Sequence, residues 1–169
     1  GIRMNSGCFN KEFKDVLISI QTINYDGQVR TIPAKEINFN YRKIDLPKDI
    51  IFLSATFKGN KKNKLEIEKY MQELKKKKDI SQPSKLKTGG STFKNPKGQT
   101  DKKVWELIRV SVPNRINFGD ALISEKHSNF FINKKNAKYE DMKTLIDYVK
   151  NKVKEKTGIN IELEIVIAG

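Results

Sequence analysis

Residues 139–167, YEDMKTLIDYVKNKVKEKTGINIELEIVI, decide the fold class, because two different hydrophobic periods meet at one glycine. From Tyr139 to Thr157 the apolar residues recur at intervals of three and four, which is the pattern of one face of a helix. Gly158 is suited to end that helix, since glycine readily adopts the left-handed conformation of a C-cap. From Ile159 to Ile167 apolar and polar residues alternate, which predicts a terminal strand.

The rest of the chain contains further segments of both kinds. β-branched and aromatic residues predict strands at 16–24, 28–32 and 50–57, the first two joined by an Asp26-Gly27 turn. Short apolar runs predict strands at 121–123 and 130–132, and helical spacing predicts helices over 61–78 and from Val104 to Ser111. Strands and helices mix without a repeat, so the class is α+β, with an α/β fold around a mixed sheet as the alternative.

Composition narrows the range of functions. The formal charge of +14 favours anionic partners, but only five of the 34 basic residues are the arginines that base readout prefers, so a nucleic-acid partner is not expected. No apolar run is long enough to span a membrane, and the first residues do not form a signal peptide. A single Cys8 and a single His127 argue against a disulfide and a zinc site and suit a cytoplasmic protein; a Cys–His nucleophilic pair stays open.

The stretch SKLKTGGSTFKNPKG, residues 84–98, places two glycines before Ser91 and surrounds them with lysines. Glycine lets a backbone approach a ligand closely, so this segment is either a catalytic loop or, as the pattern alone favours, a flexible turn between two domains. The fork of Arg42 could bind a carboxylate or phosphate, although a surface ion pair is the commoner use. Glu162 and Glu164 share one face of the predicted terminal strand.

Four motifs agree in order, spacing and type with one family. TGGSTFKNP at 88–96, SEKHSNFFIN at 124–133 and GINIELEIVIAG at 158–169 resemble the C-terminal portion of UDP-N-acetylenolpyruvoylglucosamine reductase, also called UDP-N-acetylmuramate dehydrogenase. The opening GIRMNSGCFNKEFKDVL resembles that family's G-A-V-R-M-N-A-G-A-Y-G-x-E segment, which lies against the flavin. The resemblance covers the whole chain and is closest to the shorter form of the enzyme.

The resemblance implies a domain plan and two cofactors. Residues 1–87 would form the C-terminal part of a PCMH-type FAD-binding domain, and residues 88–169 a small α/β substrate-binding domain with a terminal strand. An upstream segment carrying the loop for the FAD pyrophosphate is expected. The family uses NADPH and FAD to reduce an enolpyruvyl UDP-sugar to UDP-N-acetylmuramate for peptidoglycan, and we expect a cytoplasmic monomer that binds neither nucleic acid nor membrane.

The resemblance also assigns roles to single residues. The general acid of the family falls on Ser91, its catalytic arginine on Arg42 and its catalytic glutamate on Glu164. Substrate contacts fall on Tyr41, Lys94 and Asn95, and positions lining the isoalloxazine ring fall on Asn5, Ser6 and Gly7. In this chemistry the arginine and a protonated glutamate stabilise the charge that develops on the substrate, and the serine protonates carbon.

Three features depart from the family pattern. Relatives often carry a basic residue where this chain has Ser81, and one is usual where Val166 stands. Residues 110–118, VSVPNRINF, replace a glycine-rich segment before Gly119. The alternatives to an active fragment are therefore an inactive remnant and a basic binding module without catalysis.

Overall fold

The computed structural model describes residues 1–113 and 115–168, so Asn114, in the segment that departs from the family, and Gly169 lie outside the described residues. The chain forms two compact units, residues 1–63 and residues 64–169. Helices and antiparallel sheets both occur, which confirms the α+β class. The expected boundary between residues 87 and 88 separates a part that binds a flavin from a part that binds the substrate. This functional division stays a prediction.

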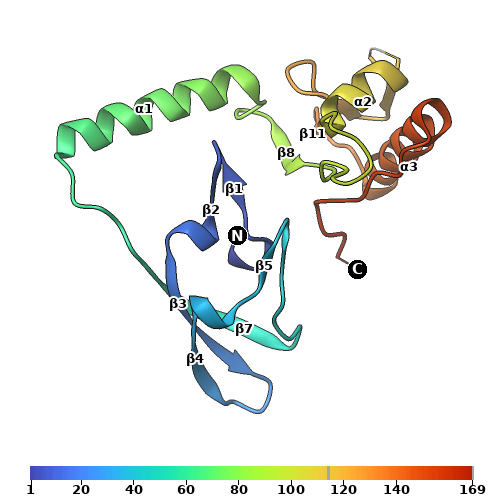
Figure 1. Ribbon diagram of the computed structural model, residues 1–169. Coiled ribbons are helices and arrows are strands. Elements are labelled where there is room, and N and C mark those ends of the chain that lie inside the picture. Colours follow the sequence, from blue (N-terminus) through green and yellow to red (C-terminus); the bar gives the residue numbers. More distant parts are fainter. Residues whose placement is uncertain (114, 169) are drawn as a thin grey trace. The chain divides into compact units, whose positions relative to one another are not determined.

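The first unit is built mainly from strands (Figure 1). They are β1 (Gly7–Cys8), β2 (Lys11–Glu12), β3 (Leu17–Asn24), β4 (Val29–Pro33), β5 (Phe39–Asn40), β6 (Lys43–Ile44) and β7 (Ile50–Phe57), with single 3₁₀ turns at Ile2–Met4, Phe13–Asp15 and Ala34–Glu36. The longer strands form an antiparallel sheet in the order β4-β3-β7. The strands predicted at 16–24, 28–32 and 50–57 are thus confirmed.

A small core holds this sheet together. Leu17, Ile20, Ile37 and Ile44 are buried in one cluster. The β3–β4 turn is closed by the backbone N–H of Gly27, which donates to the carbonyl of Asn24 at 3.1 Å, with a φ of 79° at Gly27. Glycine accepts this conformation without a Cβ clash, as the Asp26-Gly27 signal predicted.

The described part of the second unit combines a four-stranded antiparallel sheet with three helices. The elements are α1 (Lys64–Ser81), β8 (Lys87–Ser91), α2 (Val104–Ser111), β9 (Asn117–Phe118), β10 (Ala121–Ile123), β11 (Phe130–Asn133) and α3 (Tyr139–Thr157). The strand order is β8-β11-β10-β9, and α2 packs against α3 (Figure 1). The buried core includes Phe93, Leu107, Ile108, Leu145, Val149, Val153 and Ile161.

Helix α3 follows the predicted pattern closely. Its buried residues Leu145, Ile146, Val149 and Val153 form a single stripe, and each such side chain contributes about 1.5–3 kcal/mol when fully buried. The carboxylate of Asp141 accepts a hydrogen bond from the N–H of Lys138 at 2.9 Å, and Gly158 ends the helix in the left-handed conformation. Both ends therefore satisfy backbone groups that a helix leaves without partners.

Two segment predictions were wrong. Residues 159–167 do not form a strand: an isolated bridge joins Leu163 to Phe93, and the chain bends at Glu164. The ladder cannot extend toward residue 96, because the neighbouring segment reaches Pro96, which has no N–H to donate. The glycine stretch is no flexible turn, because it forms β8, paired with β11 through an irregularity that Gly90 accommodates with a φ of 91°.

Helix α1 forms where the spacing predicted it, but it has no buried residue. Of its apolar stripe, Ile67, Tyr70 and Met71 are exposed. The pattern therefore predicted the helix and its apolar face correctly, although that face is not packed against a core. No helix among residues 1–113 and 115–168 is long and apolar enough to cross a membrane.

Candidate functional site

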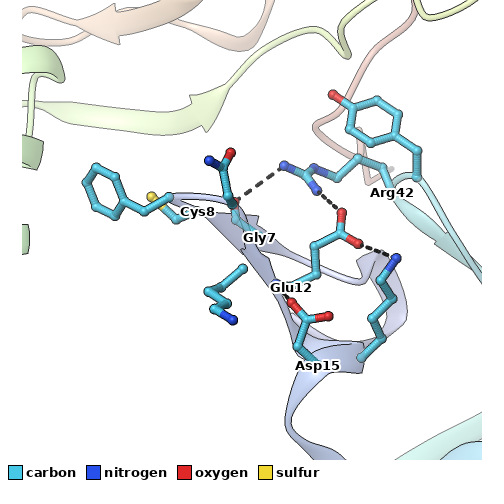
Figure 2. A pocket seen from close by; sticks show the side chains of 10 residues that line it. Gly7, Cys8, Glu12, Asp15 and Arg42 are labelled. Carbon is cyan, nitrogen blue, oxygen red and sulfur yellow. Dashed lines mark hydrogen bonds and ion pairs between the residues drawn. The ribbon is translucent and has the colours of Figure 1, made fainter.

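A pocket of about 400 Å³ lies on the first unit, lined by the β1–β2 hairpin and by Tyr41 and Arg42 (Figure 2). The hairpin reverses through Phe9 and Asn10, because Cys8 pairs with Lys11. Tyr41 and Arg42 form the turn between β5 and β6, which brings the predicted catalytic arginine beside the hairpin.

The guanidinium of Arg42 makes several contacts inside this pocket. Its two Nη atoms donate to the carbonyl oxygens of Asn5 at 3.4 Å and Gly7 at 3.5 Å. It also lies 3.8 Å from a carboxylate oxygen of Glu12 and 5.0 Å from the centre of the Tyr41 ring. The side chain of Arg42 is only 15% exposed, so its orientation is defined by the residues around it.

Glu12 connects this arginine to the flavin-lining segment that the resemblance predicts. Its Oε2 accepts a hydrogen bond from Asn5 Nδ2 at 3.0 Å and lies 3.1 Å from the ammonium of Lys14. The hydrogen bond from Lys14, with the charges of Lys14 and Arg42, holds the pKa of the Glu12 carboxyl below its usual value, against the burial that raises it. The Glu12 carboxyl is therefore negatively charged at neutral pH.

Asn5 is completely buried, and its side chain is fully used inside the protein. Its Oδ1 accepts from the backbone N–H of Lys14 at 3.1 Å, while its Nδ2 donates to Glu12. The polar side chain predicted to line a flavin ring thus fixes the loop, and Ser6 and Gly7 are the partly exposed members of the predicted trio.

Backbone strain gathers around the same pocket. Asn5, Phe9, Asn10 and Arg42 have φ values of 40°, 51°, 60° and 55°. Among the described residues the remaining non-glycine residue with a positive φ is Arg115. Such conformations cost energy for residues with a Cβ and concentrate at functional sites. The strain therefore supports a functional assignment for this pocket.

The second unit holds the other two predicted catalytic residues on adjacent backbone segments. Ser91 ends β8, and the N–H of Glu164 donates to the carbonyl of the next residue, Thr92, at 2.8 Å. Within the described residues the Ser91 hydroxyl has no hydrogen-bond partner. Arg42 belongs to the first unit, so the convergence of all three groups on one cavity stays a prediction.

The predicted substrate contacts in this unit have structural partners as well. The ammonium of Lys94 lies 3.3 Å from a carboxylate oxygen of the exposed Glu162, an ion pair that an anion can replace at little cost. Asn95 Oδ1 accepts a hydrogen bond from the N–H of Val104 at 3.0 Å and so satisfies a donor in the first turn of α2. Asn95 therefore orients the start of α2, whatever else it contacts.

Asn129 is a site-forming residue that the sequence analysis did not nominate. It is 4% exposed, its Oδ1 accepts from the N–H of Phe93 at 2.9 Å, and its Nδ2 donates to the carbonyl of the same residue at 2.8 Å. Its own carbonyl accepts from the N–H of Thr92. Asn129 thus fixes the backbone immediately after Ser91. The sequence did contain a feature that could have pointed to Asn129, because this residue lies in the family motif SEKHSNFFIN.

His127 is packed among aromatic side chains, whereas Cys8 is exposed. The ring of His127 packs edge-on against Trp105 and Phe130, and its Nδ1 accepts a hydrogen bond from the N–H of Asn129 at 3.2 Å. Burial lowers the pKa of His127. Cys8 is exposed on β1. No cluster of three or more potential metal ligands occurs in the part of the chain that the structure describes.

Comparison with known proteins identifies the family. Residues 82–168 match the family model described as UDP-N-acetylenolpyruvoylglucosamine reductase, C-terminal domain. This chain belongs to the UDP-N-acetylenolpyruvoylglucosamine reductase family. The matched range contains Ser91, Asn129 and Glu164, the residues that the fold brings to neighbouring segments.

Relatives of the family extend the similarity to the first unit. The reductase of Pelagibacter ubique is 66% identical over 167 residues, which cover 99% of this chain and 55% of that protein. The reductase of Rickettsia bellii strain RML369-C is 44% identical over 165 residues, covering 98% of this chain and 54% of that protein. The chain therefore spans about half the length of the curated relatives it matches.

A solved structure supports the fold directly. The crystal structure of UDP-N-acetylenolpyruvylglucosamine reductase from Thermus caldophilus superposes with a TM-score of 0.81 at 30% identity. The match covers 99% of this chain and 59% of that chain. The expected membership of the reductase family and the α+β architecture are both confirmed.

Proposed function

We propose that this chain is the C-terminal portion of an enzyme that reduces UDP-N-acetylglucosamine enolpyruvate to UDP-N-acetylmuramate in the cytoplasm, for peptidoglycan synthesis. The observation that carries the proposal is the position of Ser91 and Glu164 on adjacent backbone segments, inside the range that matches the reductase family. The proposed partner is a UDP-sugar, and the enzyme is proposed to act as a monomer without nucleic acid or membrane.

The residues of the first unit fit the proposed FAD. The segment from Asn5 to Gly7 is held rigidly by Glu12 and Arg42, and Ser6 and Gly7 remain partly exposed beside it. In the described part of the chain the Ser6 hydroxyl has no hydrogen-bond partner, so it can bind a ring heteroatom. When bound, FAD would supply to the substrate the hydride that NADPH has delivered.

Arg42 is proposed to stabilise the substrate carboxylate. Its planar fork matches a carboxylate, and negative charge grows on that group as hydride adds to the neighbouring enol ether. Because the guanidinium is mostly buried and already oriented, it needs little rearrangement to stabilise that charge. Tyr41, in contact with the guanidinium, is proposed to contact the substrate at the same place.

Ser91 is proposed to deliver the proton that completes the reduction at carbon. A serine hydroxyl is a weak acid, so the transfer needs the charge on the substrate and nearby donors to assist it. A protonated Glu164 is proposed to donate a hydrogen bond to the developing charge from the adjacent segment. Lys94 and Asn95 are proposed to bind the substrate, with Lys94 exchanging its ion pair with Glu162 for a phosphate.

Ser91→Ala tests the proposal in a full-length enzyme, made by joining this chain to the preceding segment of the Pelagibacter relative. NADPH should still reduce the flavin at the unchanged rate, as followed by flavin absorbance. Turnover of the enolpyruvyl substrate should fall about 10²–10⁴-fold, the usual contribution of a positioned general acid. Ser54→Ala, at an exposed serine of β7, is the matched control and should leave both rates unchanged.

Normal turnover by Ser91→Ala would reject the role of Ser91. A full-length enzyme with native folding that neither oxidises NADPH nor responds to the UDP-sugar would reject the proposed activity as a whole.

A further inference from the structure

The carboxylate of Glu12 faces the guanidinium of Arg42 in the pocket of the first unit (Figure 2). It also accepts a hydrogen bond from the side chain of Asn5. One carboxylate oxygen lies 3.8 Å from Arg42, and the other accepts from Asn5 at 3.0 Å. Glu12 thus contacts both the proposed catalytic arginine and the segment proposed to line the flavin.

The hairpin is built so that this carboxylate can reach Arg42. Glu12 pairs with Gly7 across β1 and β2. A Cβ at position 7 would lie 2.6 Å from the carbonyl oxygen of Lys11 and 2.8 Å from Cγ of Glu12. Only glycine leaves room for the Glu12 side chain at this pair, and the carbonyl of the same glycine accepts from Arg42.

The conformation of Arg42 also needs support. Its φ of 55° is unfavourable for a residue with a Cβ, so contacts with its surroundings must stabilise this backbone conformation. Acceptors around the guanidinium include the carbonyls of Asn5 and Gly7, at the long distances of 3.4 and 3.5 Å, and the Glu12 carboxylate. The carboxylate carries a charge and the two carbonyls do not, so it orients the guanidinium more strongly than either carbonyl does.

We infer that Glu12 is a positioning residue, which holds the Arg42 guanidinium in the orientation that receives the substrate carboxylate. This inference rests on the proposed function of Arg42. Glu12 itself is not assigned a contact with the substrate. The ammonium of Lys14 lies 3.1 Å from the other carboxylate oxygen and favours the charged form of Glu12.

A purely structural role in the hairpin is the competing explanation, and it predicts different results. A structural residue would lower stability and activity whether or not an arginine stands at position 42. A positioning residue acts through Arg42, so its removal should have no further effect once Arg42 is absent.

The test uses the full-length enzyme described above with Glu12→Gln, Glu12→Asp, Arg42→Ala and the double variant Glu12→Gln/Arg42→Ala. Glu12→Gln should lower kcat on the enolpyruvyl substrate on the order of tenfold, since small misplacements of a catalytic group have effects of this size or larger. NADPH-driven flavin reduction should be unchanged. Glu12→Asp, which keeps the charge on a shorter side chain, should recover part of the loss.

The double variant should turn over no more slowly than Arg42→Ala alone. Glu36→Gln, at an exposed glutamate of the same unit outside the pocket, is the matched control and should behave as the unsubstituted enzyme. Circular dichroism and a thermal unfolding midpoint establish that each variant is folded.

A second readout does not depend on activity. Phenylglyoxal modifies exposed arginines, and peptide mapping measures its rate at Arg42. Because Glu12 restrains a guanidinium whose side chain is 15% exposed, Glu12→Gln should speed modification of Arg42 severalfold, while Glu36→Gln should not. An unchanged modification rate in Glu12→Gln would overturn the inference.

The failures of the two proposals are distinguishable. Wild-type kcat in Glu12→Gln, with turnover lost in Arg42→Ala, overturns the role of Glu12 and leaves that of Arg42 intact. An equal loss from Glu12→Gln in both backgrounds also overturns the positioning role. Normal turnover by Arg42→Ala overturns the proposed role of Arg42, and the inference falls with it.

Discussion

Asn129→Ala should destabilise the second unit by about 2–4 kcal/mol, because it leaves two buried backbone groups without partners. The side chain of Asn129 is the partner of both the N–H and the C=O of Phe93, at 2.9 and 2.8 Å, and Phe93 is completely buried. Each buried group left unsatisfied costs about 1–3 kcal/mol, and the vacated space lets water recover part of that loss.

Urea denaturation of the chain measures this effect through the fluorescence of Trp105, the single tryptophan, which lies on α2 in the same unit. With a slope of roughly 2 kcal/mol per M urea, the middle of the usual range, the midpoint should fall by about 1–2 M. Asn136→Ala, at an exposed asparagine of the same unit, is the control, and a surface change of this kind should shift stability by less than about 0.5 kcal/mol. An Asn129→Ala midpoint equal to that of the control would refute the reasoning.

Two further predictions concern stability. Gly119→Ala should destabilise the second unit by about 1–3 kcal/mol, because Gly119 has a φ of 53° and a Cβ there would lie 2.6 Å from a carboxylate oxygen of Asp141. Thermal unfolding measures this loss. Gly98→Ala is the control and should cost less stability, because there is open space around Gly98. Burial lowers the pKa of His127 below its ordinary 6.5, so the unfolded chain binds that proton more readily and stability should fall as pH drops below about 6.5. His127→Asn should flatten this part of the stability profile, measured by urea denaturation across pH, and an unchanged slope would contradict the assignment.

Elements with a sustained period were predictable from sequence. The strands β3 and β7 and the helix α3 have long, regular apolar patterns, and their bounds differ little from those expected. The structure of residues 159–167 could not be predicted from sequence. The alternation of apolar and polar residues shows which side chains face the core, but it does not show whether a second strand is available for pairing. Leu163 has such a partner at Phe93, and the ladder stops before Pro96.

Candidate site residues could be nominated from sequence where a family motif contains them, and their roles stay predictions. Residues that matter through long-range contacts could not be nominated in this way. Ser91, Arg42 and Glu164 could be nominated from resemblance alone. Glu12 and Asn129 could not, because their importance depends on contacts with Arg42 and Phe93, 30 and 36 positions away. Backbone strain at Phe9 and Asn10 was equally invisible, since neither residue type requires a positive φ.

A crystal structure of the full-length enzyme with the UDP-sugar bound is the measurement that bears most directly on the proposed active site. We predict that the Ser91 hydroxyl lies within hydrogen-bond reach of the carbon to be protonated, while Arg42 and Glu164 contact the substrate carboxylate in the same cavity. A structure in which any of these three side chains points into a separate region, away from the bound substrate, would contradict the proposed mechanism.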